Sequence, residues 1–423
     1  MGRRLTAGLE ASASALLVVP AAAQAEDFRV TNLNDDGAGS LRTALEEANG
    51  DTAADRILFK SKLSGEISLQ DGLFIDEPVT VTGPGARRVT VDANDDRLLV
   101  VSDAGDTSIS GLRLTNGHAR PLSSNGGAIT VATTDLTLSR VQLAGNQADN
   151  SGGAVGSFNS SLTIENSTLS GNDAANTAGA IYAFNSDVSI RSSTISGNDA
   201  ENFGGATYFA GDGAPYPEIE ILNSTVTANS ASYGGGLYDL SMPGPHEVRG
   251  SIVAGNDGAL GADDLDDGTW AAAFSIVGDT GGATIDDNGG NLLNVDPKLK
   301  PLRNNGGPTD THAFKKSPAK NKGPSDAPNS DQRGAPRKGK ADIGAYELTK
   351  CKGVIVNRVG TAGKDKLKGT KKKDGILGLG GNDKLSGKKG KDGLCGGSGK
   401  DKLKGGPGKD KLSGGPGRDK EVQ

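Results

Sequence analysis

The C-terminal part of the chain contains aspartates that recur at a strict period of nine residues. They are Asp365, Asp374, Asp383, Asp392, Asp401, Asp410 and Asp419. An apolar residue follows two positions after Asp in six of the seven repeats, and a glycine stands five positions before every Asp. Glycine-rich turns expose backbone carbonyls and Asp adds a carboxylate, so the pattern supplies the oxygen ligands, roughly six to eight per ion, that calcium prefers. We therefore predict that this segment binds Ca²⁺.

This pattern resembles the G-G-x-G-x-D-x-U-x nonapeptide of the RTX (hemolysin-type) calcium-binding proteins. The resemblance implies a parallel β-roll in which two nonapeptides make one turn. Each ion then lies between the Asp of one repeat and the Asp of the next but one, so the repeats hold up to about five ions, from the pair Asp365–Asp383 to the pair Asp401–Asp419. The glycines expected to contribute to these metal sites are Gly378, Gly381, Gly387, Gly390, Gly396, Gly399, Gly405, Gly408, Gly414 and Gly417.

Charge is distributed unevenly along the chain. Residues 350–423 hold 20 Lys and Arg against 8 Asp and Glu, a net charge of +12; because the whole chain has 46 and 52, the remainder has 26 and 44, a net charge of −18. The acidic body argues against nucleic-acid binding. RTX blocks are usually acidic, so the lysines here should weaken calcium binding without preventing the roll. The alternative is a disordered Gly/Lys-rich tail, although disorder would not require Asp and Leu to keep one phase.

Few other residues have the types or spacing of a catalytic site. Adjacent carboxylates occur at Asp95–Asp96, Asp263–Asp264, Asp266–Asp267 and Asp286–Asp287. Neighbours on a strand face opposite sides, so no such pair is catalytic by itself. The cluster at 263–267 is the best catalytic candidate, and a solvated loop or a second calcium site is the favoured alternative. We expect His118 and His246 at turns and His312 in a C-terminal anchor segment, all structural or solvated, whereas Trp270 could stack on a sugar.

A repeat of 26 residues precedes the tail. Gly145-Asn146, Gly171-Asn172 and Gly197-Asn198 follow this step, with short alternating strands between them. Successive rungs of a solenoid stack at roughly 4.8 Å, so a column of amides is predicted to form a hydrogen-bonded ladder. Its members are Asn146, Asn172, Asn198, Asn229 and Asn256. The pattern predicts an all-β chain, a right-handed parallel β-helix (a pectate-lyase-like solenoid) followed by the parallel β-roll.

The first rungs are predicted to contain one helix among short strands. Expected strands are 28–30, 56–59, 79–81 and 97–101. Ser40 is a plausible N-cap, and Leu41, Ala44, Leu45 and Ala48 follow the i, i+3, i+4, i+7 spacing of an amphipathic helix. A helix here is well placed to cover the open end of the solenoid core.

These repeats resemble those of bacterial surface β-helix proteins. Leu169–Ala174 followed by Ala178–Ile181 is similar to a polymorphic outer-membrane-protein repeat, and the stretch from Val30 to Asn49 resembles the CSLREA module, with Gly39 in place of its Cys. Segments between 295 and 347 resemble the choice-of-anchor Q domain, which completes a β-helix ahead of sorting signals. The resemblances imply architecture and a surface location more than a chemistry.

The N-terminus predicts export. Arg3 and Arg4, the apolar run Ala15–Val19 and the small residues Ala23 and Ala25 fit a signal peptide over residues 1–25. The alternative is a disordered Ala-rich tail. The chain contains no run of 18 apolar residues, so we predict no membrane-spanning helix.

The two cysteines of an exported protein are usually paired. We predict a disulfide between Cys351 and Cys395, which would tie the start of the tail to the middle of the roll. The alternative is that Cys395 is a small core residue and Cys351 a free thiol.

The predicted organisation is a signal peptide (1–25), a β-helix with an anchor-like C-terminal part (26–349) and a calcium-binding roll (353–423). This favours a monomeric, non-enzymatic protein, secreted or on the cell surface. Its β-helix would bind an extracellular glycan, a cell-wall polymer or a surface protein, and not nucleic acid. The alternative is a calcium-dependent polysaccharide lyase or glycoside hydrolase. The two differ in whether charged side chains from neighbouring rungs converge in a groove.

Overall fold

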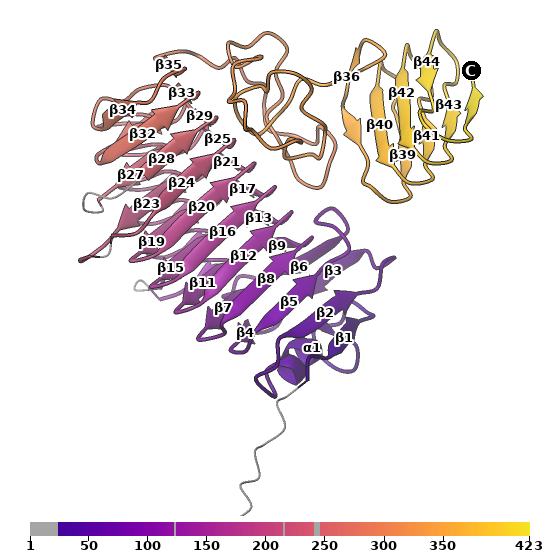
Figure 1. The fold of residues 1–423 in the computed structure, drawn as a ribbon. Coiled ribbons are helices and arrows are strands. Elements are labelled where there is room, and N and C mark those ends of the chain that lie inside the picture. The colour runs from indigo at the N-terminus through magenta and orange to yellow at the C-terminus, as the bar shows by residue number, and fades with distance from the viewer. Residues whose placement is uncertain (1–23, 122–123, 215, 241–245) are drawn as a thin grey trace, which may run out of the picture.

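The computed structural model describes residues 24–121, 124–214, 216–240 and 246–423, which form a long solenoid, an irregular segment and a small roll (Figure 1). The predicted signal peptide lies outside the described residues except for its last two positions. In the described part of the chain, no helix is long and apolar enough to cross a membrane.

Four parallel sheets, A to D, run along the solenoid. In its six central rungs the chain passes through them in the order C, A, B, D, and the rungs at either end lack sheet D. Sheet A consists of β1 (Asp27–Val30), β2 (Asp55–Phe59), β5 (Val79–Thr82), β8 (Asp106–Ser110), β12 (Asp135–Ser139), β16 (Ser161–Glu165), β20 (Asp187–Arg191), β24 (Ile219–Leu222), β28 (His246–Arg249), β32 (Thr269–Ala273) and β34 (Thr284–Asp287). Sheet B consists of β3 (Gly65–Ser68), β6 (Val89–Asp92), β9 (Arg113–Thr115), β13 (Gln142–Ala144), β17 (Thr168–Ser170), β21 (Thr194–Ser196), β25 (Thr225–Thr227), β29 (Ile252–Val253), β33 (Ile276–Val277) and β35 (Leu292–Leu293).

The other two sheets have fewer strands and complete the central rungs. Sheet C consists of β4 (Leu73–Ile75), β7 (Leu99–Ser102), β11 (Ile129–Ala132), β15 (Val155–Phe158), β19 (Ile181–Phe184), β23 (Thr207–Ala210), β27 (Leu237–Asp239) and β31 (Leu265–Asp266). Sheet D consists of β10 (His118–Ala119), β14 (Gln147–Ala148), β18 (Asp173–Ala174), β22 (Asp199–Ala200), β26 (Ser230–Ala231) and β30 (Asp257–Gly258). The predicted all-β solenoid is confirmed.

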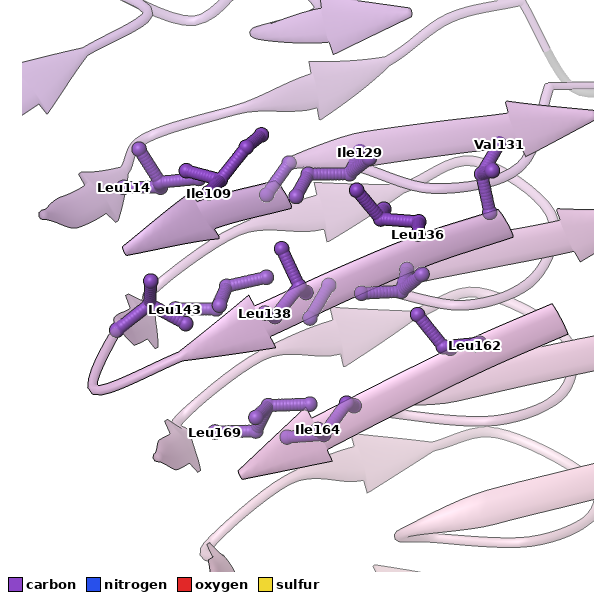
Figure 2. Close-up of a cluster of buried hydrophobic side chains, with 14 of the residues drawn as sticks. Ile109, Leu114, Ile129, Val131, Leu136, Leu138, Leu143, Leu162, Ile164 and Leu169 are labelled. Carbon is purple, nitrogen blue, oxygen red and sulfur yellow. The ribbon is translucent and has the colours of Figure 1, made fainter. Parts of the chain in front are cut away.

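The core follows from the alternation of side chains along each strand. In β16, Leu162 and Ile164 are buried between half-exposed neighbours. They lie directly over Leu136 and Leu138 of β12, because the two strands pair in register. Figure 2 shows these aliphatic side chains stacked rung upon rung. Each rung thus buries the same columns, and removing that apolar surface from water is the main stabilising contribution.

The helix α1 (Leu41–Ala48) covers the first rungs, as predicted. The hydroxyl of Ser40 accepts the backbone N–H of Thr43 at 3.1 Å. The four predicted apolar residues of the helix are buried, and the helix packs against β1, β2 and β4.

The asparagine ladder is confirmed. The Asn146 amide donates to Oδ1 of Asn172 at 2.9 Å, and the Asn172 amide donates to Asn198 at 2.8 Å. The same bond continues through Asn229 to Asn256. Each Oδ1 also accepts the backbone N–H of the preceding ladder residue, so the buried amides lose little hydrogen bonding on leaving water.

The irregular segment between 295 and 349 lies along sheet B. Gln332 accepts the hydroxyl of Thr194 at 2.6 Å and donates to the hydroxyl of Thr168 at 3.0 Å. Arg333 and Asp331 form a fully buried ion pair at 2.8 Å, and the Arg333 guanidinium stands 3.9 Å above the ring of Tyr346.

The roll begins after a short antiparallel hairpin, β36 (Lys350–Cys351) and β37 (Val354–Ile355). The inner roll sheet consists of β38 (Arg358–Val359), β40 (Gly375–Gly380), β42 (Gly393–Ser398) and β44 (Lys411–Ser413). The outer roll sheet consists of β39 (Lys366–Lys368), β41 (Lys384–Ser386), β43 (Lys402–Lys404) and β45 (Lys420–Val422). Between them lies a thin core in which Ile376, Leu385, Leu394 and Leu403 are buried.

The two cysteines form the predicted disulfide, with a Cα–Cα distance of 5.9 Å between Cys351 and Cys395. This distance lies within the range of native disulfides. The bond joins the hairpin to β42, in the middle of the inner roll sheet. The prediction is confirmed, and the free-thiol alternative is excluded in this structure.

Candidate calcium site and the surfaces of the β-helix

Aspartates 18 residues apart lie over one another on successive turns of the roll. The backbone N–H of Asp365 donates to Oδ1 of Asp383 at 2.8 Å, and Asp374 and Asp392 are joined in the same way at 2.8 Å. The same bond joins Asp383 to Asp401, Asp392 to Asp410, and Asp401 to Asp419. The next-but-one pairs expected from the repeat are therefore neighbours in two columns of carboxylates.

The second carboxylate oxygen is left without a partner in the central repeats. Oδ2 of Asp383, Asp392, Asp401 and Asp410 is buried and accepts no hydrogen bond from any described residue. An unpaired buried carboxylate oxygen is costly, and such atoms in a native fold call for a water or an ion.

Glycine leaves space beside each of these oxygens. A Cβ on Gly378, Gly387, Gly396, Gly405 or Gly414 would collide with Oδ2 of the Asp five positions later. For the first three, it would also meet the carbonyl oxygen of the glycine 18 residues further on. Each glycine therefore keeps open a small space bounded by a carboxylate and a backbone carbonyl.

The second set of predicted glycines has positive φ. Gly381, Gly390, Gly399, Gly408 and Gly417 have φ between 98° and 154°, a conformation that side chains disfavour. At Gly399, Gly408 and Gly417, the place of a Cβ is taken by the carbonyl oxygen of the glycine one full turn earlier. At Gly390 that oxygen belongs to Lys372. Lys372 is the one residue that replaces glycine two positions before Asp, and its carbonyl still occupies the same place.

In the first two repeats, unlike the later ones, a threonine donates hydrogen bonds to Oδ2 of the Asp. The sequence analysis did not predict this difference. The backbone N–H and hydroxyl of Thr361 donate to Oδ2 of Asp365 at 2.6 and 3.0 Å. Thr370 does the same for Asp374 at 2.6 and 2.8 Å. The sequence feature that indicates these bonds is the Thr four positions before Asp, where later repeats have Leu379, Lys388 or glycine. These two carboxylates are satisfied within their own repeats.

Burial raises the pKa of Asp383 and of Asp392 above the usual value. The carboxylates one turn above and below raise each pKa further, whereas one backbone hydrogen bond opposes the shift. No three His, Cys, Asp or Glu side chains gather at one point in the described residues. The donor set is instead two carboxylates with backbone carbonyls, hard oxygen ligands that fit Ca²⁺.

Comparison with known families agrees with both halves of this architecture. Residues 72–288, just over half of the chain, match the family of the right handed beta helix region. The chain belongs to the right-handed β-helix family. Residues 359–394 and 396–420 match the RTX calcium-binding nonapeptide repeat, so this β-helix protein carries calcium-binding repeats. No curated protein and no solved structure matches the chain, and the narrower CSLREA, outer-membrane-repeat and anchor Q resemblances stay predictions.

The acidic cluster at 263–267 holds turns of the β-helix. Oδ1 of the buried Asp264 accepts the backbone and side-chain N–H groups of Asn256 at 2.9 and 2.8 Å, which ends the asparagine ladder. Oδ2 of Asp264 accepts the N–H of Asp279 at 2.8 Å. Burial raises the pKa of Asp264, and these hydrogen bonds oppose the shift. Asp263 and Asp267 accept backbone N–H groups of nearby turns.

The structure corrects the expectations for Trp270 and His246. Trp270 is fully buried in the core, so it cannot stack on a sugar. His246 does not lie at a turn; it begins β28, is buried, and has its Nε2 3.0 Å from Asp239. Its ring faces Trp270 at a centroid distance of 5.4 Å. The two residues pair across β28 and β32 at inward-facing positions, which is why both are buried.

The other histidines have structural partners. His118 lies in β10, not at a turn, with its ring nitrogens 2.9 Å from Asp95 and 2.8 Å from Asp149. His312 lies 2.8 Å from the Ser196 hydroxyl and 2.6 Å from the Lys300 carbonyl, so it joins the irregular segment to sheet B. Burial lowers the pKa of His312.

A groove of about 770 Å³ runs along the turns between sheets C and A. Acidic residues of neighbouring rungs line it: Asp106, Asp135, Asp187 and Glu218. Asp106 and Asp135 pair directly across adjacent strands, whereas Oδ1 of Asp187 is occupied by the backbone N–H of Glu218. The described residues that line the groove include no Lys, Arg or His.

Aromatic residues gather on the solvent side of sheet C and the turn before it. This aromatic face consists of Phe158, Tyr182, Phe203, Tyr208, Tyr233 and Tyr238. The rings of Tyr182, Tyr208 and Tyr238 stack at centroid distances of 5.7 and 5.3 Å with interplanar angles of 15° and 4°. Phe203 stacks on Tyr233 and lies 4.9 Å from Tyr238. The face was not predicted, because its members are far apart in sequence.

Proposed function

We propose that this protein acts outside the cell, where its aromatic face binds a neutral glycan without cleaving it. The observation that carries the proposal is the half-exposed aromatic face. In a chain with only 4% aromatic residues, six of them share one solvent-facing surface. Rigid amphipathic tyrosines are enriched at binding surfaces, and contiguous exposed apolar patches mark interaction sites.

The orientation of the rings suits a sugar chain that lies along the solenoid. Because the tyrosine rings stack on one another, their edges and hydroxyls are what they present to solvent. No described residue pairs with the hydroxyls of Tyr182, Tyr208 or Tyr238, and burial raises the pKa of each, to about 12 for Tyr208. They therefore stay neutral donors. A net charge of −18 outside the tail disfavours an acidic ligand here.

The calcium-binding roll supports an extracellular setting. RTX repeats are typical of secreted proteins, and a disulfide is stable in an oxidising environment. Asp383, Asp392, Asp401 and Asp410 with the neighbouring glycine carbonyls would hold the ions. Bound calcium supplies positive charge between stacked carboxylates, and the roll, whose apolar core is thin, gains the binding free energy as folding free energy.

A glycan array of the full chain in calcium, with reducing-sugar release measured on every hit, tests the proposal. We expect Tyr208→Ala to weaken binding of the best glycan at least roughly tenfold, as for a central aromatic contact. Phe74→Ala is the matched control, since Phe74 is 62% exposed in the same sheet but remote from the aromatic face. Equal loss in both variants, or no hit on the array, contradicts the proposal.

The acidic groove favours a second candidate, a glycoside hydrolase. Acid–base cleavage of a glycosidic bond needs two carboxylates that flank it, and Asp106 and Asp135 are two carboxylates side by side on neighbouring rungs. A lyase acts on an acidic sugar, and the described lining of the groove offers no Lys, Arg or His to bind its carboxylate. Reducing-sugar release that disappears in Asp135→Asn and forms no unsaturated sugar, the product of a lyase, would establish the hydrolase and replace the binding-only proposal.

A further inference from the structure

Lysines form a straight column on the outer roll sheet. Lys366, Lys384, Lys402 and Lys420 pair in register across β39, β41, β43 and β45, and all four are exposed. Parallel strands are about 4.8 Å apart, so each turn of the roll presents one lysine side chain at this spacing. Lys368 and Lys404 add charge beside this lysine ladder, with Ser386 between them.

The same sequence position carries glycine in β40 and β42 of the inner roll sheet, and Lys411 in β44. A Cβ on Gly375 would collide with the carbonyl of Ile355, and one on Gly393 with the carbonyl of Cys351. The hairpin β36–β37 therefore covers that sheet, and Cys395 packs with Cys351 on its covered side. The two positions that the hairpin covers carry glycine, whereas Lys411, which pairs with Gly393 on the next strand, is exposed. The ladder is thus a property of the free face and not of the repeat as such.

Among the described residues, the lysine ladder has no ion-pair partner. In the described chain, none of the lysines of residues 350–423 lies within ion-pair distance of a carboxylate. Like charges directly opposite on neighbouring strands are destabilising. Calcium adds further positive charge to the roll. The row of lysines is thus destabilised by mutual repulsion of the ammonium groups. An external polyanion would relieve this repulsion.

We propose that the outer roll sheet binds a linear acidic polysaccharide along the lysine ladder. An extended chain with one carboxylate per sugar presents a single file of charges, which matches one lysine per turn in a straight row. A DNA duplex presents two helical rows, with a charge per roughly 1.7 Å of axis, and these turn away from a flat sheet. This site lies on a different part of the chain from the aromatic face and goes beyond the function proposed above.

Calorimetric titration of the full chain with a galacturonate hexamer at fixed free calcium tests the site. The methyl-esterified hexamer is the control ligand, because it keeps the backbone and loses the charge. Only the acidic hexamer should bind. Its affinity should fall with salt with a log–log slope of magnitude about 2.8–3.6, from four contacts that each release roughly 0.7–0.9 of a counterion. Equal binding of the ester that persists in Tyr208→Ala, where the aromatic face is impaired, or no salt dependence, overturns the proposal.

Two variants separate the ladder from net charge. In the first, Lys366, Lys384, Lys402 and Lys420 are changed to Gln; in the second, Lys364, Lys391, Lys400 and Lys409, which precede Asp in the turns, are changed to Gln. We expect at least roughly a tenfold loss of hexamer affinity in the first and at most about threefold in the second. Calcium titration of both shows that the roll still folds. Equal losses overturn the site.

Two further outcomes decide the occupant. A short DNA duplex that displaces the hexamer at equal charge concentration would show that the ladder prefers nucleic acid. Concentration-dependent dimerisation that the ladder variant abolishes would show that the acidic body of a second copy covers it. Either result overturns the polysaccharide. Tyr208→Ala should leave hexamer binding unchanged, so failure here is distinguishable from failure of the aromatic face.

Discussion

At the scale of single residues, the aspartates of the roll are not equivalent. Oδ2 of Asp392 is buried without a partner, and Asp392 lies between Asp374 and Asp410. Oδ2 of Asp365 is satisfied by Thr361, and Asp365 has one neighbour, Asp383. A calcium ion should therefore gain more from the central carboxylate than from the first.

Asp392→Asn should remove about two bound calcium ions per chain, and Asp365→Asn about one or none, because each ion requires a carboxylate from both turns. Calorimetric calcium titration of the two full-length variants measures the stoichiometry. The two substitutions are chemically identical, so each controls for the other. The same loss of sites in both would show that the threonine-satisfied carboxylates bind calcium as the others do.

The raised pKa values of Asp383 and Asp392 predict how the calcium-free roll responds to pH. The folded-state pKa lies above the ordinary 3.8, so the folded roll binds more protons than the unfolded chain. In chelator, stability should therefore fall as pH rises from 3.8 through the raised pKa. Calcium should reverse this trend, because it binds the ionised carboxylates. Scanning calorimetry of the roll transition at about 0.15 M salt, which screens the lysines, measures both series. A roll whose stability in chelator rises over this window contradicts the stacking of buried carboxylates.

At the scale of elements, two asparagine ladders that differ in burial connect the rungs of the β-helix. Asn172 lies in the buried ladder and donates to both Asn198 and the carbonyl of Leu143. Asn176 lies in a second, partly buried ladder, where it donates to Asn150 and accepts from Asn202. Water can replace the bonds of the outer ladder more readily than those of the inner one.

Asn172→Ala should cost roughly 1–3 kcal/mol, because it leaves buried backbone and amide groups unpaired. Asn176→Ala removes the same side chain from the outer ladder and should cost clearly less. Urea unfolding in excess calcium, followed by the fluorescence of the buried Trp270, measures both variants. Equal costs would show that the depth of burial does not set the contribution of the ladder.

At the scale of the whole molecule, the disulfide joins the covered side of the roll to the hairpin that follows the β-helix. Cys351 belongs to the hairpin and Cys395 to β42. The buried Arg333 adds a second tie, since it donates to the carbonyl of Val356 at 3.2 Å. The roll is thus held on one face and free on the other, which is what leaves the lysine ladder open to solvent.

Replacing both cysteines with Ser should raise the calcium concentration needed to protect the roll from proteolysis. The bond closes a loop with a sequence separation of 44, and such a constraint contributes up to about 4 kcal/mol in the chain-entropy model. The β-helix should be unaffected, since its core is separate. The denatured protein should contain no reactive thiol. Two thiols per chain, or an unchanged calcium requirement in the variant, would contradict this coupling.

The sequence by itself determined the features that repeat. The 26-residue step predicts the Asn146–Asn256 ladder and the nonapeptide predicts the Asp pairs, because stacking places every equivalent residue over its counterpart. The even number of cysteines and the predicted export are enough to predict the disulfide between Cys351 and Cys395. Only the tertiary structure decided what breaks the repeat: that Asp264 ends the ladder, that His246 and Trp270 face inward, and that Thr361 satisfies Asp365. It also decided which face of each element is free, since the docking of the hairpin covers one sheet of the roll and leaves the lysines on the other. Local periodicity sets the register within a solenoid, whereas burial and exposure depend on which distant segments pack against it.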